Sequence, residues 1–259
     1  MVKEWVERMP PKRRWEIHLL LISVPLLLAL CGYHPTGEAV HLIPGKLTQL
    51  PTFLAAHLVI WASCLGLGFL ISEVTDAELH LPHSSWTKTL AIGLLWSVAI
   101  RLSLLPVAFL ASKLIGAQGL QAFSERMSEV LNLENLAGRP LQTLIIYGTL
   151  ALMAGFLEEL WRAGFLAGLQ RLCPRAFASR AGTFAMIVAT AAFFGLGHLY
   201  QGGMGVAVTF VLGIGLGSIL VWRKSYWEAA FAHTAFDAVS FALAYHLASQ
   251  PPLLPLAPG

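Results

Sequence analysis

Charged residues are scarce in this chain of 259 residues, since Lys, Arg, Asp and Glu together make up 12% of it. That is about half the share found in an ordinary soluble domain. Apolar residues reach 56%, and the mean hydropathy is +0.68. So few polar groups cannot cover the surface of a soluble protein of this length. The composition excludes a soluble enzyme, a disordered chain and a nucleic-acid binder with a basic face, and it indicates a polytopic membrane protein.

Cysteine is also scarce, with Cys31, Cys64 and Cys173 far apart in the sequence and each in or next to an apolar stretch. They form no CxxC pair, which argues against a disulfide framework. We interpret all three as packing residues. Internal repeats and low-complexity tracts are lacking as well, so we expect one membrane domain over residues 1–259.

Seven segments are long and apolar enough for spanning helices, which need about 20 mostly apolar residues. We therefore predict an all-α fold, a polytopic transmembrane bundle of about seven to eight spanning helices. The first segment is short and follows a basic stretch, so a cleaved leader is its alternative interpretation. The segments are residues 17–32, 52–72, 89–112, 141–167, 182–200, 204–222 and 226–247.

The positions of Lys and Arg between these segments predict the orientation. With the N-terminus in the cytoplasm, the inner segments carry eleven of these residues and the outer segments four. We therefore expect a cytoplasmic N-terminus and, with seven spans, an external C-terminus. The last residues, 250–259, contain four prolines and no charge, and we expect an irregular tail there.

Residues 115–135 differ from the spans because their apolar side chains recur at helical spacing with acidic and basic residues between them. This pattern indicates an amphipathic helix at the outer membrane interface. A solvated connecting helix is the alternative.

Charges within the spans are costly, at least about 2.5–3.5 kcal/mol for Arg, Lys or Asp at a helix centre, so they usually pair or line a wet cavity. The fourth segment contains Glu158, Glu159 and Arg162. Arg162 is four residues from Glu158 and three from Glu159, so either carboxylate is within its reach on a helix. One glutamate can thus be held ionised while the other serves as a general base. A buried pair that only fixes helix register is the alternative.

Two further motifs place histidines in apolar helices. The fifth segment ends in Phe194-x-x-x-His198, and the seventh contains His233-x-x-x-Asp237. Four residues separate His233 from Asp237, so the carboxylate can hydrogen-bond the imidazole or share a ligand with it.

The order of these motifs resembles that of the CPBP intramembrane protease family, which includes the type II CAAX prenyl endopeptidases and the bacterial Abi, or bacteriocin-immunity-like, proteins. The resemblance covers roughly residues 140–247, and the motif core spans 141–247. The first motif departs from the family pattern, Glu-Glu-x-x-x-Arg followed by Gly. Here Arg162 comes one residue early, and Ala163 occupies the usual place of the arginine.

The resemblance implies an intramembrane endopeptidase that activates water for attack on a peptide bond. It implies that Glu158 is the base, that His198 helps to hold the water, and that His233 with Asp237 polarises the carbonyl. Glu159 and Arg162 would orient these groups. A zinc ion held by Glu158, His198 and His233 is possible, although the spacing is not HExxH and glutamate chemistry without a metal is favoured.

The expected partners are a peptide or protein substrate, with or without a lipid modification, and membrane lipids, with no nucleic acid. Two other functions remain open: a non-catalytic immunity or adaptor protein on this scaffold, and a proton-coupled transporter, which would often show an inverted repeat. Arg101, inside the third segment, is expected to pair with Glu158 or Glu159, to bind a substrate carboxylate or to make a structural pair. Gly213 and Gly217 form a GxxxG motif that we interpret as a packing surface.

The depths of the motifs do not agree at first sight. At a rise of 1.5 Å per residue, Glu158 and His233 both lie near the inner leaflet. His198 lies about 24 Å from the inner face by the same rise. Three explanations are open if the three motifs are to meet: the glycines around His198 turn the chain inside the membrane, the helix is tilted, or the end of the predicted span is misplaced.

Overall fold

The computed structural model describes residues 2–31, 43–83 and 85–249. The predicted tail 250–259 lies outside these residues. Within them the chain is helical and contains no strand, which confirms the all-α prediction. The helices are α1 Val2–Arg8, α2 Pro11–Cys31, α3 Leu50–Ser72, α4 Trp86–Val130, α5 Leu133–Leu136, α6 Pro140–Leu172, α7 Pro174–Phe177, α8 Arg180–Leu196, α9 Gly202–Ser218 and α10 Tyr226–Ala248, with short turns η1 Leu47–Gln49, η2 Leu199–Gln201 and the π-helical η3 Ile219–Arg223.

The protein is an integral membrane protein by the length and composition of its helices. Five helical segments among the described residues are long and apolar enough to cross a bilayer: α2, α3 with η1, α4, α6, and the run from η2 to η3 through α9. α8 is apolar but has 17 residues, and α10, with 23 residues, is not among the five. These seven helices correspond to the seven predicted segments.

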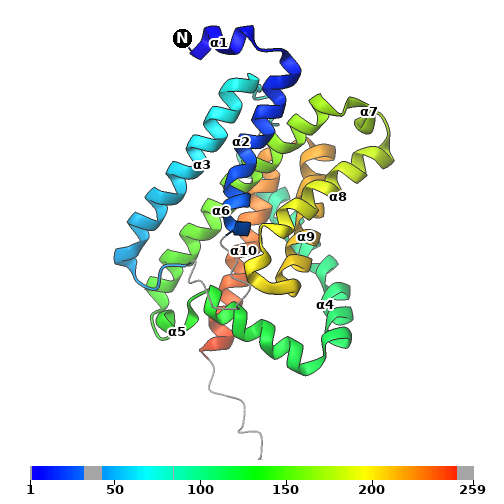
Figure 1. The fold of residues 1–259 in the computed structure, drawn as a ribbon. Helices are drawn as coiled ribbons and strands as arrows, with labels where there is room; N and C mark the ends of the chain where they lie inside the picture. The colour runs from blue at the N-terminus through cyan, green and yellow to red at the C-terminus, as the bar shows by residue number, and fades with distance from the viewer. Residues whose placement is uncertain (1, 32–42, 84, 250–259) are drawn as a thin grey trace, which may run out of the picture.

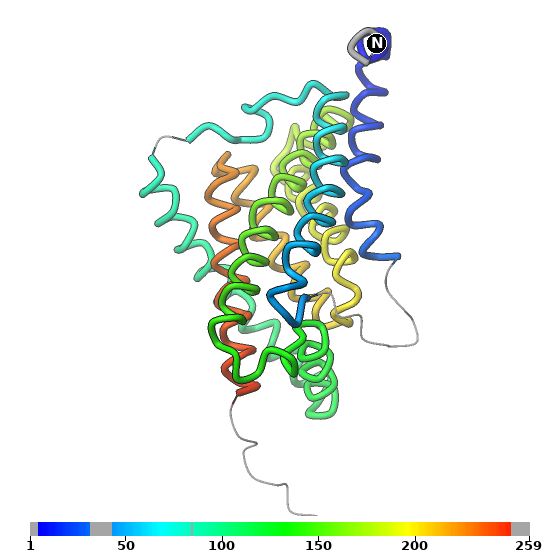
Figure 2. Tube along the Cα trace, turned by 90° about the vertical axis from the view of Figure 1, so that its left-hand side faces the viewer, coloured from blue at the N-terminus to red at the C-terminus, as the bar shows by residue number. Residues whose placement is uncertain are grey.

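The bundle is arranged around α6, which packs against α2 and α10 (Figure 1). α3 covers α2, α4 covers α10, and α8 and α9 form a hairpin that closes the remaining side. Both views place the start of α2 and the end of α10 at opposite ends of the bundle (Figures 1 and 2). That placement agrees with an odd number of crossings.

α4 turns sharply at Gly116, whose φ of 64° and ψ of −172° interrupt the helix. An L-residue with a side chain rarely adopts this backbone conformation, which explains the glycine at this point. The chain then continues as a helix to Val130 and crosses the base of the bundle in Figure 1. The helix predicted near residues 115–135 is therefore present over most of its length. Its position at a membrane surface stays a prediction.

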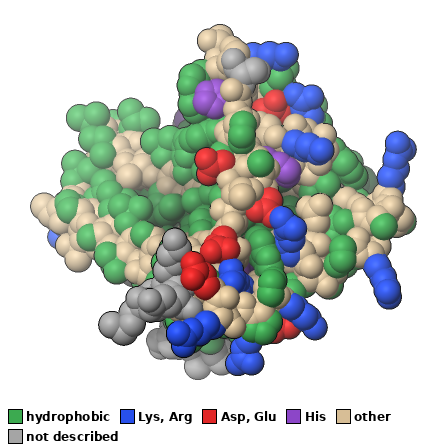
Figure 3. Space-filling view, turned by 90° about the horizontal axis from the view of Figure 1, so that it is seen from above, with side chains coloured by type: hydrophobic (Ala, Val, Ile, Leu, Met, Phe, Trp, Pro, Cys, Tyr) green, Lys and Arg blue, Asp and Glu red, His purple; other side chains and the backbone are tan. Residues whose placement is uncertain are grey.

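Exposed basic side chains gather at the end where α2 begins, and Figure 3 shows this end from above. They include Lys12, Arg13, Arg171, Arg175, Arg180, Arg223 and Lys224.

The cysteines are placed differently from our interpretation. Cys31 and Cys173 are exposed at the ends of α2 and α6, and Cys64 is partly buried, so describing all three as packing residues was wrong for the first two.

Candidate active site

The first motif lies on α6, where α10 approaches closely. A Cβ atom at Gly155 would stand 2.0 Å from Thr234 Oγ1 and 2.8 Å from the Ala230 carbonyl oxygen. No residue with a side chain fits that space, so the glycine sets the distance between the two helices. One turn further along α6, Glu158 and Glu159 face the region that α10 borders.

Arg162 binds Glu159 through two parallel hydrogen bonds. Its Nε donates to Oε2 at 3.0 Å, and its Nη2 donates to Oε1 at 3.2 Å. Both side chains are 0% exposed. This fork geometry is the strongest form of an arginine–carboxylate pair. The one-residue shift of Arg162 therefore still produces a pair within the first motif, at a separation of three residues.

Glu159 also holds His233, which the sequence did not predict. The Nδ1 atom of His233 lies 2.9 Å from Glu159 Oε1. An ionised carboxylate only accepts hydrogen bonds, so the proton of this contact is on Nδ1. The imidazole, 3% exposed, is thereby fixed in one orientation by a chain of contacts from Arg162 through Glu159.

The opposite ring nitrogen of His233 faces two other carboxylates. Nε2 lies 3.8 Å from Glu158 Oε2 and 3.6 Å from Asp237 Oδ2. These separations are longer than hydrogen bonds and lie within the range of an ion pair between a protonated imidazole and a carboxylate. The Glu158 and Asp237 side chains are 18% and 17% exposed, so they are the accessible acids of this cluster.

His198 joins the cluster through Phe194. Its Nδ1 lies 2.9 Å from the Phe194 carbonyl oxygen, which leaves Nε2 as the ring nitrogen available to another group. The Phe194 ring is 6.1 Å from the His233 ring, and its face is 4.1 Å from the Arg162 guanidinium carbon. The aromatic ring thus packs near both histidines and contacts the cation.

The apparent conflict of depths is resolved by the length and direction of α8. We predicted a fifth span over 182–200, but α8 ends at Leu196 and α9 begins at Gly202. α8 runs obliquely across the bundle in Figure 1. Gly202 has a φ of 78°, which lets the chain reverse at once. The turn therefore brings His198 close to the other two motifs.

The GxxxG motif of α9 packs against α8 and also leaves room for Arg162. A Cβ at Gly213 would lie 3.0 Å from the Ala191 side chain and 3.4 Å from Arg162 Nη1. A Cβ at Gly217 would lie 3.0 Å from Ile187 and 4.0 Å from Arg162 Cδ. The packing function that we predicted is present, and the space beside the guanidinium is a second consequence of the same glycines.

Arg101 does not pair with Glu158 or Glu159, as one of our alternatives had it. Its Nη2 donates to the Phe236 carbonyl oxygen at 2.7 Å, and its guanidinium stands 4.5 Å from the centre of the Phe236 ring. Arg101 thus holds α4 against α10, in keeping with the structural role that was the third alternative.

The three residues named as candidate zinc ligands are not grouped as a ligand set. In the part of the chain that the structure describes, no three His, Cys, Asp or Glu side chains are arranged to bind a metal ion. The Nδ1 atom of His233 is directed at Glu159, and that of His198 at the Phe194 carbonyl oxygen. Each histidine thus has only Nε2 left for another group.

His18 is a buried polar residue that we did not single out. Its ring nitrogens contact the carbonyl oxygens of Gly68 at 3.0 Å and Gly164 at 2.9 Å, and Ser72 Oγ lies 3.1 Å from Nδ1. It therefore joins α2, α3 and α6 two residues beyond Arg162. A histidine inside the first apolar segment was the available signal, but its partners are distant in sequence.

The comparisons agree with the motifs. Residues 140–239 match the family model described as type II CAAX prenyl endopeptidase Rce1-like. This segment is an Rce1-like domain. The resemblance to the CPBP intramembrane protease family is thereby confirmed. No curated protein and no solved structure matches the chain significantly.

The Rce1-like domain contains all six candidate residues and extends from the start of α6 into α10. The helices α2, α3 and α4 lie outside the matched segment. α2 and α4 nevertheless contact the domain directly, through His18 and Arg101. The family is one of CAAX proteases, so a peptide or protein is the class of substrate that it implies.

Proposed function

We propose that this protein is an intramembrane endopeptidase that hydrolyses a peptide bond with a water molecule activated by Glu158. The observation that carries the proposal is the arrangement around His233. The Arg162–Glu159 pair fixes one ring nitrogen, and the other faces the two accessible acids, Glu158 and Asp237. A fixed imidazole between two partly exposed carboxylates is suited to water activation.

The proposed reaction begins with a water molecule bound between Glu158 and the imidazole of His233. Glu158 takes one proton from the water as its oxygen forms a bond to the scissile carbonyl carbon. His233 acts here as an imidazolium, with one proton on Nδ1 toward Glu159 and a second on Nε2. The carbonyl oxygen becomes an oxyanion that accepts a hydrogen bond from Nε2–H. When the C–N bond breaks, Glu158 returns the proton to the leaving amine, so two chains with free carboxyl and amino ends result.

The remaining residues act on the position of these groups. Glu159 and Arg162 are positioning residues, because both are fully buried and reach the reaction through His233. Asp237 lies beside Nε2 and stabilises the positive imidazolium during the reaction. His198 offers its free Nε2 to the water or to the peptide, as the family resemblance implies.

The test is cleavage of reporter peptides, prenylated and unmodified, by the purified protein in lipid. Glu158→Gln and His198→Ala should each abolish cleavage and leave the melting curve close to that of the wild type. Glu134→Gln, an exposed glutamate on α5, is the matched control and should keep full activity. Activity that survives both site variants would refute the proposal.

Two further measurements complete this test. Assays with and without a chelator decide whether a metal takes part, and restoration by zinc would favour the metal-dependent alternative. Comparison of protein termini in cells that carry the wild type or Glu158→Ala would identify the natural substrates.

A further inference from the structure

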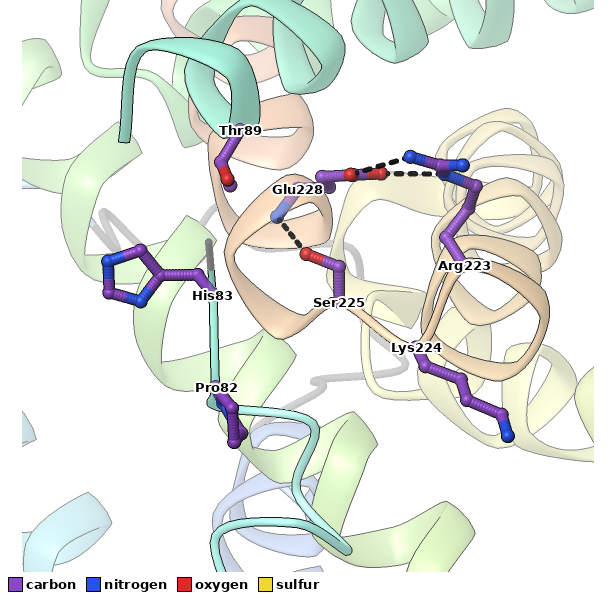
Figure 4. A pocket seen from close by; sticks show the side chains of 7 residues that line it. All are labelled: Pro82, His83, Thr89, Arg223, Lys224, Ser225 and Glu228. Atoms are coloured by element: carbon purple, nitrogen blue, oxygen red, sulfur yellow. Dashed lines mark hydrogen bonds and ion pairs between the residues drawn. The ribbon is translucent and has the colours of Figure 1, made fainter. Parts of the chain in front are cut away.

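A polar pocket of about 370 Å³ opens at the Lys- and Arg-rich end of the bundle, between the start of α4 and the start of α10. It contains none of the six candidate site residues. Its walls come from three places along the chain (Figure 4): Pro82 and His83 before α4, Thr89 on α4, and Arg223, Lys224, Ser225 and Glu228 at the corner between η3 and α10.

Arg223 is held in place by Glu228 and is partly exposed. Its Nε and Nη2 donate to the two oxygens of Glu228 at 3.0 and 2.9 Å. The Glu228 side chain is 7% exposed, whereas that of Arg223 is 44% exposed. The acid of the pair is therefore buried and its cation is presented, with Nη1 still free of this pair. Lys224 is exposed at the rim and turned outward in Figure 4.

An apolar groove of about 410 Å³ lies next to this pocket and shares Arg223 with it. Its other walls are Ile92, Leu95, Trp96 and Ala99, which recur along one side of α4. Leu95 is 69% exposed. The groove follows α4 away from the charged end and into the segment that crosses the bilayer. A cationic site at the helix end thus continues into an apolar channel at hydrocarbon depth.

Aromatic rings support this placement at the membrane boundary. Trp86 and Trp227 pack edge to face with centroids 4.8 Å apart beside the pocket. The indole Nε1 of Trp227 donates to the Leu81 carbonyl oxygen at 2.7 Å. Tryptophans with one apolar face and one bonded polar edge are typical of the headgroup level.

We propose that this pocket and groove bind one anionic phospholipid. Its phosphate lies against Arg223, with Lys224 as the second cation, and one acyl chain follows Ile92, Leu95 and Ala99 down α4. An anionic phospholipid needs a cation for its phosphate and an apolar groove for its acyl chain, and the pocket and the groove supply one each. The site is separate from the proposed catalytic cluster, so the inference goes beyond the proposed function.

The proposal is tested by counting lipids bound to the purified full chain by native mass spectrometry. The detergent-solubilised protein is titrated with phosphatidylglycerol or with phosphatidylcholine of the same acyl chains. The expected result is one saturable molecule of phosphatidylglycerol that phosphatidylcholine does not replace at equal concentration. Equal binding of the two lipids would overturn the proposal.

Charge variants test the headgroup end. Lys224→Gln leaves the buried pair intact, and Arg223→Gln combined with Glu228→Gln removes the pair without leaving a buried charge alone. Lys224→Gln should weaken the binding of phosphatidylglycerol about fivefold, as expected for one cation near an anionic surface. The double variant leaves the net charge unchanged and should weaken binding because the presented guanidinium is lost. Arg180→Gln, which removes an exposed arginine at the same end outside the pocket, should leave the affinity unchanged. Unchanged affinity in both pocket variants would overturn the proposal.

Two bulky substitutions test the acyl-chain end. Ala99→Trp fills the groove and should reduce the affinity, whereas Val98→Trp, on an exposed neighbouring position of α4, should not. Equal affinities in these two variants would show that the groove holds no chain. Glycerol phosphate in excess should not displace the bound lipid. If it does so, the pocket is a site for a free phosphate and the lipid proposal fails.

Discussion

At the scale of single residues, the candidate site depends on a buried ion pair that does not itself face the substrate. Arg162 and Glu159 are fully buried, and Glu159 also accepts a hydrogen bond from Nδ1 of His233, which fixes the orientation of the imidazole. A buried pair of this kind adds little net stability over an apolar substitute, but breaking it leaves an uncompensated charge. We therefore regard its main contribution as the fixed orientation of the imidazole.

Replacing Arg162 with Met should destabilise the protein by about 3–5 kcal/mol, because Glu159 is then buried without its cation. The same replacement at Arg171, at the end of α6, breaks an exposed pair with Glu78 and should cost about 0–1 kcal/mol. Unfolding of both variants by denaturant in the same detergent measures the difference. Similar losses for both variants would contradict the buried-pair interpretation.

At the scale of helices, the contact of α6 with α10 decides whether the motifs meet. The glycine at position 155 brings the α10 backbone next to α6, and Glu158 is one turn away from it. His18 on α2 joins this helix to α3 and α6, because its ring contacts carbonyl oxygens of both. Close approach at small residues and hydrogen bonds between helices are the usual means of assembly in membranes.

Gly155→Val should separate α6 from α10, since its Cβ would stand 2.0 Å from Thr234 Oγ1. Overpacking of this kind costs about 1–3 kcal/mol. A displacement of about 1 Å at the site lowers the rate on the order of 100-fold. Gly148→Val on the same helix is the control, because nothing lies within 4 Å of its added Cβ. Peptide cleavage and melting temperature are measured for both variants, and equal activities would exclude this function of Gly155.

The connection between α3 and α4 is tied to the end of α6 by Glu78, which bonds Arg171. Burial alone raises the pKa of Glu78. The Thr75 backbone N–H and the Arg171 guanidinium lower the pKa by more than burial raises it, so the net pKa lies below its ordinary value. A carboxyl group whose pKa is lower in the folded state stabilises the fold at neutral pH. This contribution is lost as the pH falls through the folded-state pKa.

Glu78→Gln should therefore lower the melting temperature slightly at pH 7 and not at a pH below both pKa values. The ordinary pKa of glutamate, about 4.3, marks where the difference between the two proteins begins to shrink. Melting curves of both proteins from pH 7 to pH 3 provide the measurement. A difference that grows as the pH falls would contradict the direction of the shift.

At the scale of the whole molecule, exposed positive charge is concentrated at one end of the bundle. Exposed Lys and Arg side chains gather where α2 begins (Figure 3), and α10 ends at the opposite side (Figure 1). Membrane proteins usually keep their Lys- and Arg-rich loops in the cytoplasm. A cytoplasmic N-terminus stays a prediction from this distribution, and it would place Arg171, Arg175, Arg180 and the proposed lipid pocket on the cytoplasmic side.

The two exposed cysteines report this orientation directly. Cys173 follows α6 at the basic end, and Cys31 ends α2 at the other end. A maleimide that cannot cross membranes should label Cys31 in intact cells, and Cys173 only after the membrane is opened. Cys31→Ser and Cys173→Ser identify each signal in mass spectra. Labelling of Cys173 in intact cells would reverse the assigned orientation.

The sequence by itself determined the class of fold and the identity of the candidate residues. Low charge and long apolar runs predict a bundle of helices in a membrane, because a helix satisfies its backbone hydrogen bonds within a single apolar segment. Residues spaced by three or four on one helix, such as Glu159 and Arg162, must lie close together. Local spacing therefore predicted pairs within α6 and within α10, and the glycines near His198 indicated a turn.

Only the tertiary structure decided which groups meet across helices. The bond from Glu159 to His233 spans 74 residues, and Arg101 reaches α10 instead of the glutamates on α6. The short, oblique α8 sets the position of His198, and no periodicity in the sequence encodes that direction. Contacts between helices depend on how side chains of distant segments fill the space between them, and a single sequence states the volumes without stating the neighbours.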